Sequence, residues 1–169
     1  MHTQVRAAYI AFHHPGSTAL RVRPLAGYAW LHEVKFDGYR CQLHKARNDV
    51  VIFSKTAETS RTALPGIRDA VLTLPCKSAI IDGEVAACGK DGTPEISGRS
   101  IAATIARRSC VWCFDLMALN GEDLRLLPLV TRKQKLCVLL RRLDHPYVRY
   151  SEPFKNVEPL LSECHRRGS

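Results

Sequence analysis

Short apolar runs, separated by turn residues, recur along the chain and predict β-strands. The runs that combine alternating or continuous apolar positions with β-branched and aromatic residues are residues 28–36, 39–45, 50–54, 78–85, 109–117 and 147–151. Asp37-Gly38 separates the first two runs and is a strong hairpin signal. The first three runs therefore predict an antiparallel meander.

Two stretches place apolar residues at helical spacing instead. The first contains Leu64, Ile67, Val71 and Leu74, with Pro65 near its start. The second, residues 131–143, is a basic amphipathic helix. A weaker helix is expected over 101–106, and Asn156 is placed to cap a final helix that ends at residue 166.

These elements indicate one folded domain after an irregular start. Residues 1–26 carry the breakers Pro15-Gly16 and Pro24 and are expected to form a loop-rich lead-in. Residues 27–169 supply all the predicted strands and helices. The length of 169 residues is typical of a single domain. We expect an α+β fold in which antiparallel sheets are flanked by helices.

The charge of the chain favours a polyanionic partner. The formal net charge is +9 at pH 7, and each phosphate contacted by lysine or arginine releases counterions. A solvated basic surface is the alternative. Part of the charge lies in the predicted helix over 131–143, which faces either DNA or water. There is no apolar run of about 18 residues, so no membrane segment is expected.

The seven cysteines are odd in number and scattered, and they show no paired framework. We expect them to be separate, buried, small hydrophobic residues in a reducing compartment. Cys110 and Cys113 form the one C-x-x-C. In a strand, positions three apart point to opposite faces, which argues against a shared metal or a redox pair.

The residues with the clearest chemical potential form K-x-D-G-x-R. In an extended strand Glu33, Lys35 and Asp37 alternate onto one face, so a lysine nucleophile would lie between two acids. Gly38 supplies backbone freedom for the turn, and Arg40 adds a cation. The alternative interpretation is a surface hairpin with an ordinary salt-bridged lysine.

The order of the later motifs favours the nucleophile interpretation of K-x-D-G-x-R over the surface hairpin. K-x-D-G-x-R is followed by Ile81-Asp82-Gly83-Glu84-Val85, then by residues 114–125, which begin F-D-L, and then by residues 127–133, Leu-Pro-Leu-Val-Thr-Arg-Lys. This series resembles the adenylation domain of ATP-dependent DNA ligases. It is most similar to the ligase domain of bacterial non-homologous end-joining enzymes, over roughly residues 28–168.

The resemblance implies a role for each residue of the first motif. Lys35 would attack the α-phosphate of ATP, expel pyrophosphate and hold AMP as a phosphoramidate. Glu33 and the adjoining backbone at Val34 would bind the adenine edge. Arg40 would contact the ribose or the nicked DNA. Asp37 and Gly38 would supply the second acid and the turn.

The later motifs would complete the nucleotide site. Glu84 would serve the ribose or a catalytic Mg²⁺ or Mn²⁺, and Phe114 would stack on adenine. A buried salt bridge for Glu84 and a core position for Phe114 are the alternatives. Where the family has S-R-x-G, this chain has Ser54-Lys55-Thr56-Ala57. Lys55 keeps the charge and would bind the nucleotide, but it lacks the planar guanidinium fork of arginine.

The resemblance also implies partners and a location. The fold would be the nucleotidyltransferase adenylation fold of ATP-grasp-like ligases, incomplete at its C-terminus, because the chain ends before E-G-x-V-x-K and before an OB-fold domain. We therefore expect impaired nick sealing. Expected partners are a nicked or broken DNA duplex and other end-joining proteins or a separately encoded C-terminal half, in the bacterial cytoplasm with the nucleoid.

Two other functions remain open from the sequence. The chain is alternatively a non-catalytic nucleic-acid-binding remnant that uses its positive charge. It is alternatively a guanylyltransferase of the RNA-capping type, which shares K-x-D-G-x-R. The long similarity over residues 114–133 argues against the capping enzyme.

Overall fold

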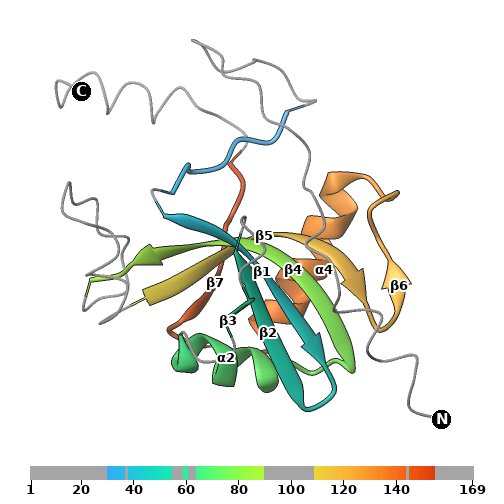
Figure 1. Cartoon of the computed structure of the whole chain (residues 1–169). Coiled ribbons are helices and arrows are strands. Elements are labelled where there is room, and N and C mark those ends of the chain that lie inside the picture. Colours follow the sequence, from blue (N-terminus) through green and yellow to red (C-terminus); the bar gives the residue numbers. More distant parts are fainter. Residues whose placement is uncertain are drawn as a thin grey trace, which may run out of the picture. The chain divides into compact units, whose positions relative to one another are not determined.

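The computed structural model describes residues 30–36, 38–54, 59–60, 64–89, 109–143 and 145–154 (Figure 1). The chain divides into two compact units. The larger unit comprises Met1–His13 and Phe36–Tyr150, and the smaller unit comprises His14–Lys35 and Ser151–Ser169. The predicted lead-in over 1–26 and the helices over 101–106 and 156–166 lie outside the described residues.

The larger unit is built on one mixed sheet with the order β3-β2-β1-β4-β5-β6, in which β7 also pairs with β5. The strands are β1 (Tyr39–Ala46), β2 (Asp49–Ser54), β3 (Thr59–Ser60), β4 (Ser78–Ala87), β5 (Ser109–Leu119), β6 (Glu122–Asp123) and β7 (Val148–Tyr150). All pairs are antiparallel except β5 with β7, which is parallel. The long strands β4 and β5 lie at the centre (Figure 1).

Two helices, α2 (Pro65–Leu72) and α4 (Leu129–Arg141), share a hydrophobic core with one face of this sheet. Leu43 of β1 lies opposite Ile52 of β2 and Ile81 of β4, so the three side chains share that face. The fully buried members of the core include Leu43, Ile67, Ile81, Leu116 and Leu136. Among the described residues, no helix is long and apolar enough to cross a membrane.

Lys45 is buried on the core face and satisfies the end of α2. Its Nζ donates to the carbonyl of Leu74 at 3.0 Å and to that of Leu72. These carbonyls lie at and just beyond the C-terminus of the helix, where the last turn leaves acceptors without helical donors. The lysine therefore fixes α2 against β1.

The predicted α+β class and most of its elements are confirmed. The strands expected over 39–45, 50–54, 78–85, 109–117 and 147–151 correspond to β1, β2, β4, β5 and β7, and the helices to α2 and α4. Asn120 and Gly121 both have positive φ, as the tight turn from β5 to β6 requires. Local periodicity was sufficient for these elements.

The predicted hairpin across Asp37-Gly38 is wrong. Residues 30–36 form no regular strand, and His32 instead makes an isolated antiparallel bridge with Phe154 inside the smaller unit. The His32 N–H donates to the Phe154 carbonyl at 3.3 Å, and the reverse hydrogen bond is 2.9 Å. A strand has only two edges, and β1 uses both of them for β2 and β4.

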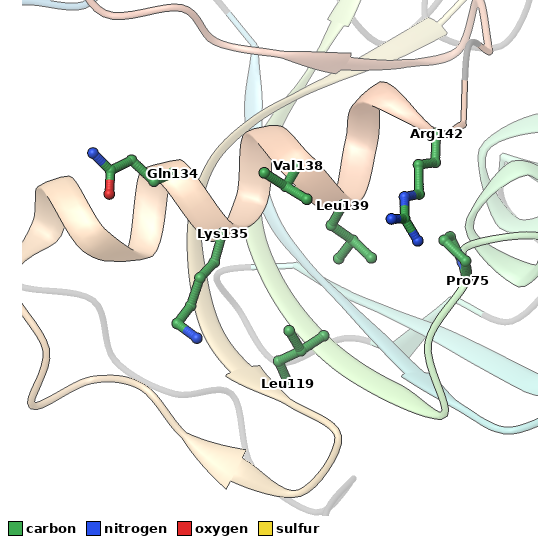
Figure 2. Close-up of a pocket in the computed structure, with 7 residues that line it drawn as sticks. All are labelled: Pro75, Leu119, Gln134, Lys135, Val138, Leu139 and Arg142. Carbon is green, nitrogen blue, oxygen red and sulfur yellow. The ribbon is translucent and has the colours of Figure 1, made fainter.

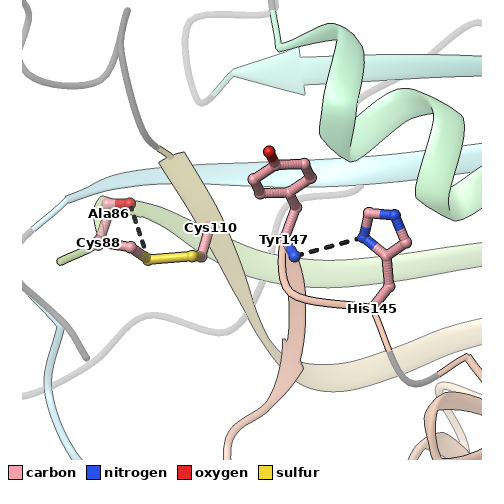
Figure 3. The surroundings of a disulfide bond; sticks show 5 residues. All are labelled: Ala86, Cys88, Cys110, His145 and Tyr147. Carbon is pink, nitrogen blue, oxygen red and sulfur yellow. Dashed lines mark hydrogen bonds between the residues drawn. A yellow bond between two sulfur atoms is a disulfide. The ribbon is translucent and has the colours of Figure 1, made fainter. Parts of the chain in front are cut away.

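The expectation of separate cysteines is also wrong for two of them. Cys88, after the end of β4, forms a disulfide with Cys110 near the start of β5 (Figure 3), and their Cα atoms are 6.0 Å apart. The antiparallel pairing of β4 with β5 brings these distant positions together, since Ala86 lies opposite Cys110. Cys41 and Cys113 remain buried thiols, and burial raises the pKa of both.

We predict that Leu136→Ala lowers the free energy of unfolding by about 2–4 kcal/mol, because it removes a core side chain and leaves a cavity. Leu136 of α4 is 0% exposed, whereas Leu126 is 98% exposed. Leu126→Ala is therefore the matched control and should leave stability within about 0.5 kcal/mol. Urea unfolding monitored by circular dichroism measures both. Equal losses of stability for Leu136→Ala and Leu126→Ala would contradict a core position for Leu136.

Candidate functional site

The predicted site residues of the larger unit meet on the sheet face opposite the core. Arg40 of β1 lies directly opposite Glu84 of β4, and Glu84 lies opposite Trp112 of β5. Residues opposite each other in adjacent strands project to the same face, so these three side chains form one row across β1, β4 and β5. Asp82 belongs to the same face of β4, two residues from Glu84.

A bidentate ion pair joins the first two motifs. Arg40 Nη2 lies 2.8 Å from Asp82 Oδ2, and Arg40 Nε lies 3.3 Å from Asp82 Oδ1. Asp82 is 1% exposed, and the Arg40 side chain is 29% exposed. Burial raises the pKa of Asp82, while the hydrogen bonds and charge of Arg40 oppose that rise. The pair therefore holds Arg40 by a carboxylate that has little contact with water.

Arg40 also lies against the predicted adenine-stacking residue. Its guanidinium carbon is 5.3 Å from the centroid of the Phe114 ring, a cation–π distance. Phe114 occurs where the pairing of β4 with β5 shifts register between Asp82 and Gly83. Phe114 is thus partly exposed beside the ion pair, with Arg40 over one face of its ring.

The residue that follows Lys35 is anchored on β5. The Phe36 ring stacks on the Trp112 ring with a centroid distance of 4.6 Å and an interplanar angle of 12°. Arg149 of β7 lies over the same indole, with its guanidinium carbon 5.8 Å from the ring centroid. Such aromatic pairs contribute about 0.5–1.5 kcal/mol beyond the area they bury. This stacking fixes where the chain enters the larger unit.

The two motif glycines are required by close packing. A Cβ on Gly38 would lie 2.2 Å from the carbonyl oxygen of Val85, and a Cβ on Gly83 would lie 2.9 Å from the carbonyl oxygen of Trp112. The sequence analysis assigned Gly38 to a turn that needs unusual backbone freedom, but its φ is not in the left-handed region. That reason is corrected: Gly38 lets the backbone before β1 approach β4.

The F-D-L segment is tied to α4 by two cations. Arg132 Nε and Nη2 donate to the two carboxylate oxygens of Asp115 at 2.8 and 2.9 Å. The Lys133 Nζ donates to the Phe114 carbonyl at 3.1 Å and lies 5.1 Å from the Tyr150 ring centroid. The hydrogen bonds to Asp115 raise the pKa of Arg132. Two residues of the basic helix thus face neither DNA nor water.

The first motif's remaining residues fall elsewhere. Lys35 and Val34 are exposed and Glu33 is half-buried, and all three belong to the smaller unit. Asp37 and Lys55 lie outside the described residues. The roles expected for these residues stay predictions.

Sequence reasoning missed three contributors to this face: Asp82, Asp115 and Trp112. A carboxylate in an apolar strand requires a cation or hydrogen-bond donors, so Asp82 and Asp115 carried a usable signal. The cation that pairs with each carboxylate is Arg40 for Asp82 and Arg132 for Asp115. Which cation pairs with which carboxylate depends on strand register and helix packing. Trp112 carried no local signal, because its partner Phe36 lies far from it in the sequence.

We predict that Arg40→Ala lowers stability by about 2–4 kcal/mol at neutral pH, because it leaves the Asp82 carboxylate buried without its cation. The pKa of Asp82 in the folded state then rises further above its ordinary value of 3.8. Between those two values the folded chain binds a proton that the unfolded chain does not, so the variant gains stability as pH falls. Its deficit relative to the wild type should shrink from pH 8 to pH 5 in urea unfolding.

Arg125→Ala supplies the control for this prediction. Arg125 makes an even shorter bidentate pair with Asp123, at 2.6 Å, but both side chains are about half exposed, at 51% and 53%. Removing it should change stability little at any pH, since exposed pairs are screened by water. A pH-independent deficit for Arg40→Ala would contradict a buried, charged Asp82.

Comparisons with known proteins agree with the order of the motifs. The family model described as ATP dependent DNA ligase domain matches residues 17–162. A probable DNA ligase of Dictyoglomus turgidum is 35% identical over 152 residues, which cover 80% of this chain and 26% of that protein. DNA ligase B of Mycobacterium tuberculosis is 31% identical over 124 residues, 68% of this chain and 24% of its own length. The chain thus spans about a quarter of these relatives.

The fold is similar to that of solved ligase structures. Mycobacterial DNA ligase D complexed with ATP and MES superimposes with a TM-score of 0.59 at 20% identity, over 81% of this chain and 44% of that one. The ligase domain of LigD from M. tuberculosis gives the same values. These matches confirm the resemblance inferred from the motifs. The chain belongs to the ATP-dependent DNA ligase domain family.

Proposed function

We propose that this chain forms a lysyl-AMP intermediate on Lys35 as the first step of DNA joining. In that step a bond forms between Lys35 Nζ and the α-phosphorus of ATP. The bond from that phosphorus to the oxygen bridging the α- and β-phosphates breaks, and pyrophosphate leaves with the electron pair. The lysine nitrogen must be neutral to attack, so its proton is lost before or during the step.

The observation that carries this proposal is the shared face of β1, β4 and β5. Arg40, Glu84 and Phe114 come from three separate motifs. The resemblance implies that Arg40 contacts the ribose or the nicked DNA, that Glu84 serves the ribose or a metal, and that Phe114 stacks on adenine. The strand register brings Arg40 and Glu84 to one sheet face, and the Phe114 ring lies against the guanidinium of Arg40. Support also comes from the solved relative, which is described as complexed with ATP. We infer that this face, here called the motif face, binds the nucleoside of ATP.

Each residue of the motif face has a proposed task. Phe114 stacks adenine on the side of its ring away from Arg40, and Glu84 accepts a hydrogen bond from the ribose. Arg40 contacts the ribose or the nicked DNA. Because Asp82 already holds the Arg40 side chain in one direction, little conformational entropy of that side chain is lost when the substrate binds. Glu33 and Val34 bind the adenine edge, and Lys55 contacts phosphate.

A divalent ion fits this site only in company with the substrate. Among the described residues there is no group of three or more histidine, cysteine or acidic side chains that could hold a metal. Mg²⁺ commonly binds through one or two carboxylates and the phosphates of a nucleotide, and Glu84 offers such a carboxylate. Mg²⁺ or Mn²⁺ would neutralise charge on the phosphate oxygens.

The polynucleotide substrate proposed is a nicked or broken DNA duplex. The relatives are named DNA ligases, and the net charge of +9 favours a polyanion. The wider role proposed is DNA repair and recombination by non-homologous end joining, at the bacterial nucleoid, with other end-joining proteins or a separate C-terminal half. The competing candidate, a DNA-binding chain without chemistry, rests on the same charge.

We predict that the wild type becomes covalently labelled by α-radiolabelled ATP with Mg²⁺, and that Lys35→Ala abolishes the label. In the proposed step only the Lys35 nitrogen attacks ATP. The label retained by Lys35→Ala should therefore equal the background seen without protein. Lys77→Ala is the matched control, because Lys77 is an exposed lysine of the larger unit outside every motif. Denaturing gels of stoichiometric reactions measure the retained label.

Two further lanes separate the competing functions. Labelling by GTP in preference to ATP would assign the chain to the capping class. Absence of label from either nucleotide, with a correctly folded wild type, would remove the enzymatic proposal and leave the DNA-binding candidate. The label should also be lost in acid, as expected for a phosphorus–nitrogen bond.

DNA binding gives an independent prediction. The affinity for a nicked duplex should fall linearly on a plot of log K against log salt, with a slope of about −0.9 for each phosphate neutralised. Lys35→Ala should change this slope by about one at most, because a single cation is removed. Fluorescence anisotropy at several salt concentrations measures it. Salt-independent binding, or none, would contradict DNA as the partner.

A further inference from the structure

A pocket lies between α4, the end of β5 and the turn before β4 (Figure 2). Its volume is about 330 Å³, large enough for one or two amino-acid side chains. Its lining residues come from the turn before β4, from β5 and from α4, and are Pro75, Leu119, Gln134, Lys135, Val138, Leu139 and Arg142. Of these residues, only Leu119 lies within a ligase motif, at the end of β5 in residues 114–125.

The floor and the rim of this pocket differ in chemistry. Leu119, Val138 and Leu139 supply apolar surface, and Val138 is 58% exposed although it lies in the middle of a helix. Lys135 and Arg142 project at the two ends of the pocket in Figure 2. The pocket therefore offers an apolar surface with a cation at each end.

These two cations take part in no ion pair among the described residues. In the part of the chain that the structure describes, neither Lys135 nor Arg142 has a carboxylate within 4.0 Å. Arg132 and Lys133 of the same helix are directed instead to Asp115 and the Phe114 carbonyl. α4 thus divides its basic residues between a structural set on the sheet and a set left for an external anion.

We propose that this pocket is a docking site for an acidic peptide segment of a partner protein. A leucine-sized side chain of that segment would fill the apolar floor, and carboxylates on either side would pair with Lys135 and Arg142. The charges are complementary, since the chain carries a net charge of +9 and the proposed segment is acidic. Burial of the apolar side chain supplies affinity, and the ion pairs orient the segment.

Other occupants fit less well. A DNA phosphate would use the two cations but would leave Val138 and Leu139 in contact with water or with a polar backbone. A second copy of this chain would bring another net charge of +9 to a surface with two cations that make no ion pair among the described residues. Both alternatives give outcomes that the experiment below distinguishes.

The test measures fluorescence anisotropy of a fluorescein-labelled peptide with the full chain. The probe is a short peptide in which leucines at helical spacing are flanked by glutamates. One control peptide replaces the glutamates with glutamine and another replaces the leucines with alanine. We expect saturable binding of the acidic leucine peptide, and at least about fivefold weaker binding of each control peptide.

Three variants identify the surface, and two others serve as controls. Lys135→Glu and Arg142→Glu should each weaken the probe about fivefold or more, and Val138→Ser should weaken it about fivefold. Arg141→Glu and Val130→Ser are matched controls. They make the same changes at exposed positions of α4 that do not line the pocket, and should have effects under about twofold. Circular dichroism melts verify that each variant folds.

Several results would overturn the proposal. These are no binding of the acidic leucine peptide, equal binding of the glutamine peptide, or an Arg141→Glu effect as large as that of Arg142→Glu. Duplex DNA that outcompetes the peptide, loses affinity with Lys135→Glu and ignores Val138→Ser would assign the surface to nucleic acid. Self-association abolished by Val138→Ser, without peptide binding, would assign it to a second copy.

Discussion

The bidentate pair between Arg40 and Asp82 is the interaction on which the motif face depends. Asp82 lies in an apolar strand at the centre of the sheet, where an unpaired carboxylate would cost several kcal/mol of desolvation. Arg40 meets that need and is held rigidly in return. The same guanidinium lies over Phe114, so one residue of K-x-D-G-x-R contacts both later motifs. Gly38 makes the arrangement possible, because any Cβ there would collide with the carbonyl of Val85.

A second layer of interactions supports this face from behind the sheet. Arg132 and Lys133 hold the Asp115 carboxylate and the Phe114 carbonyl, and so tie the F-D-L segment to α4. α4 is in turn anchored by Leu136 in the core. Residues that look like a DNA-binding stripe in the sequence therefore split into two groups. One group, Arg132 and Lys133, supports the motif face, and the other, Lys135 and Arg142, lines a separate pocket.

The sequence correctly predicted features that depend on neighbouring residues, such as strands and helices. It failed for contacts between residues that are far apart in the chain. Apolar periodicity located β1, β2, β4, β5, α2 and α4, and the order of the motifs led to the ligase family. The hairpin at Asp37-Gly38 was wrong because its local turn signal says nothing about which strands occupy the edges of β1. The bond between Cys88 and Cys110 could not be foreseen, since cysteine spacing does not reveal strand register. The same limitation hid Asp82 as the ion-pair partner of Arg40.

Amide NMR spectra of the full chain, recorded with and without ATP and Mg²⁺, test the assignment of the nucleotide face most directly. If ATP binds the motif face, the largest shift changes fall on Arg40, Glu84, Phe114 and their strand neighbours in β1, β4 and β5. Residues of α4 that line the pocket, such as Val138, should remain unchanged. Shift changes confined to α4, or none in β1, β4 and β5 at saturating ATP, would contradict the assignment.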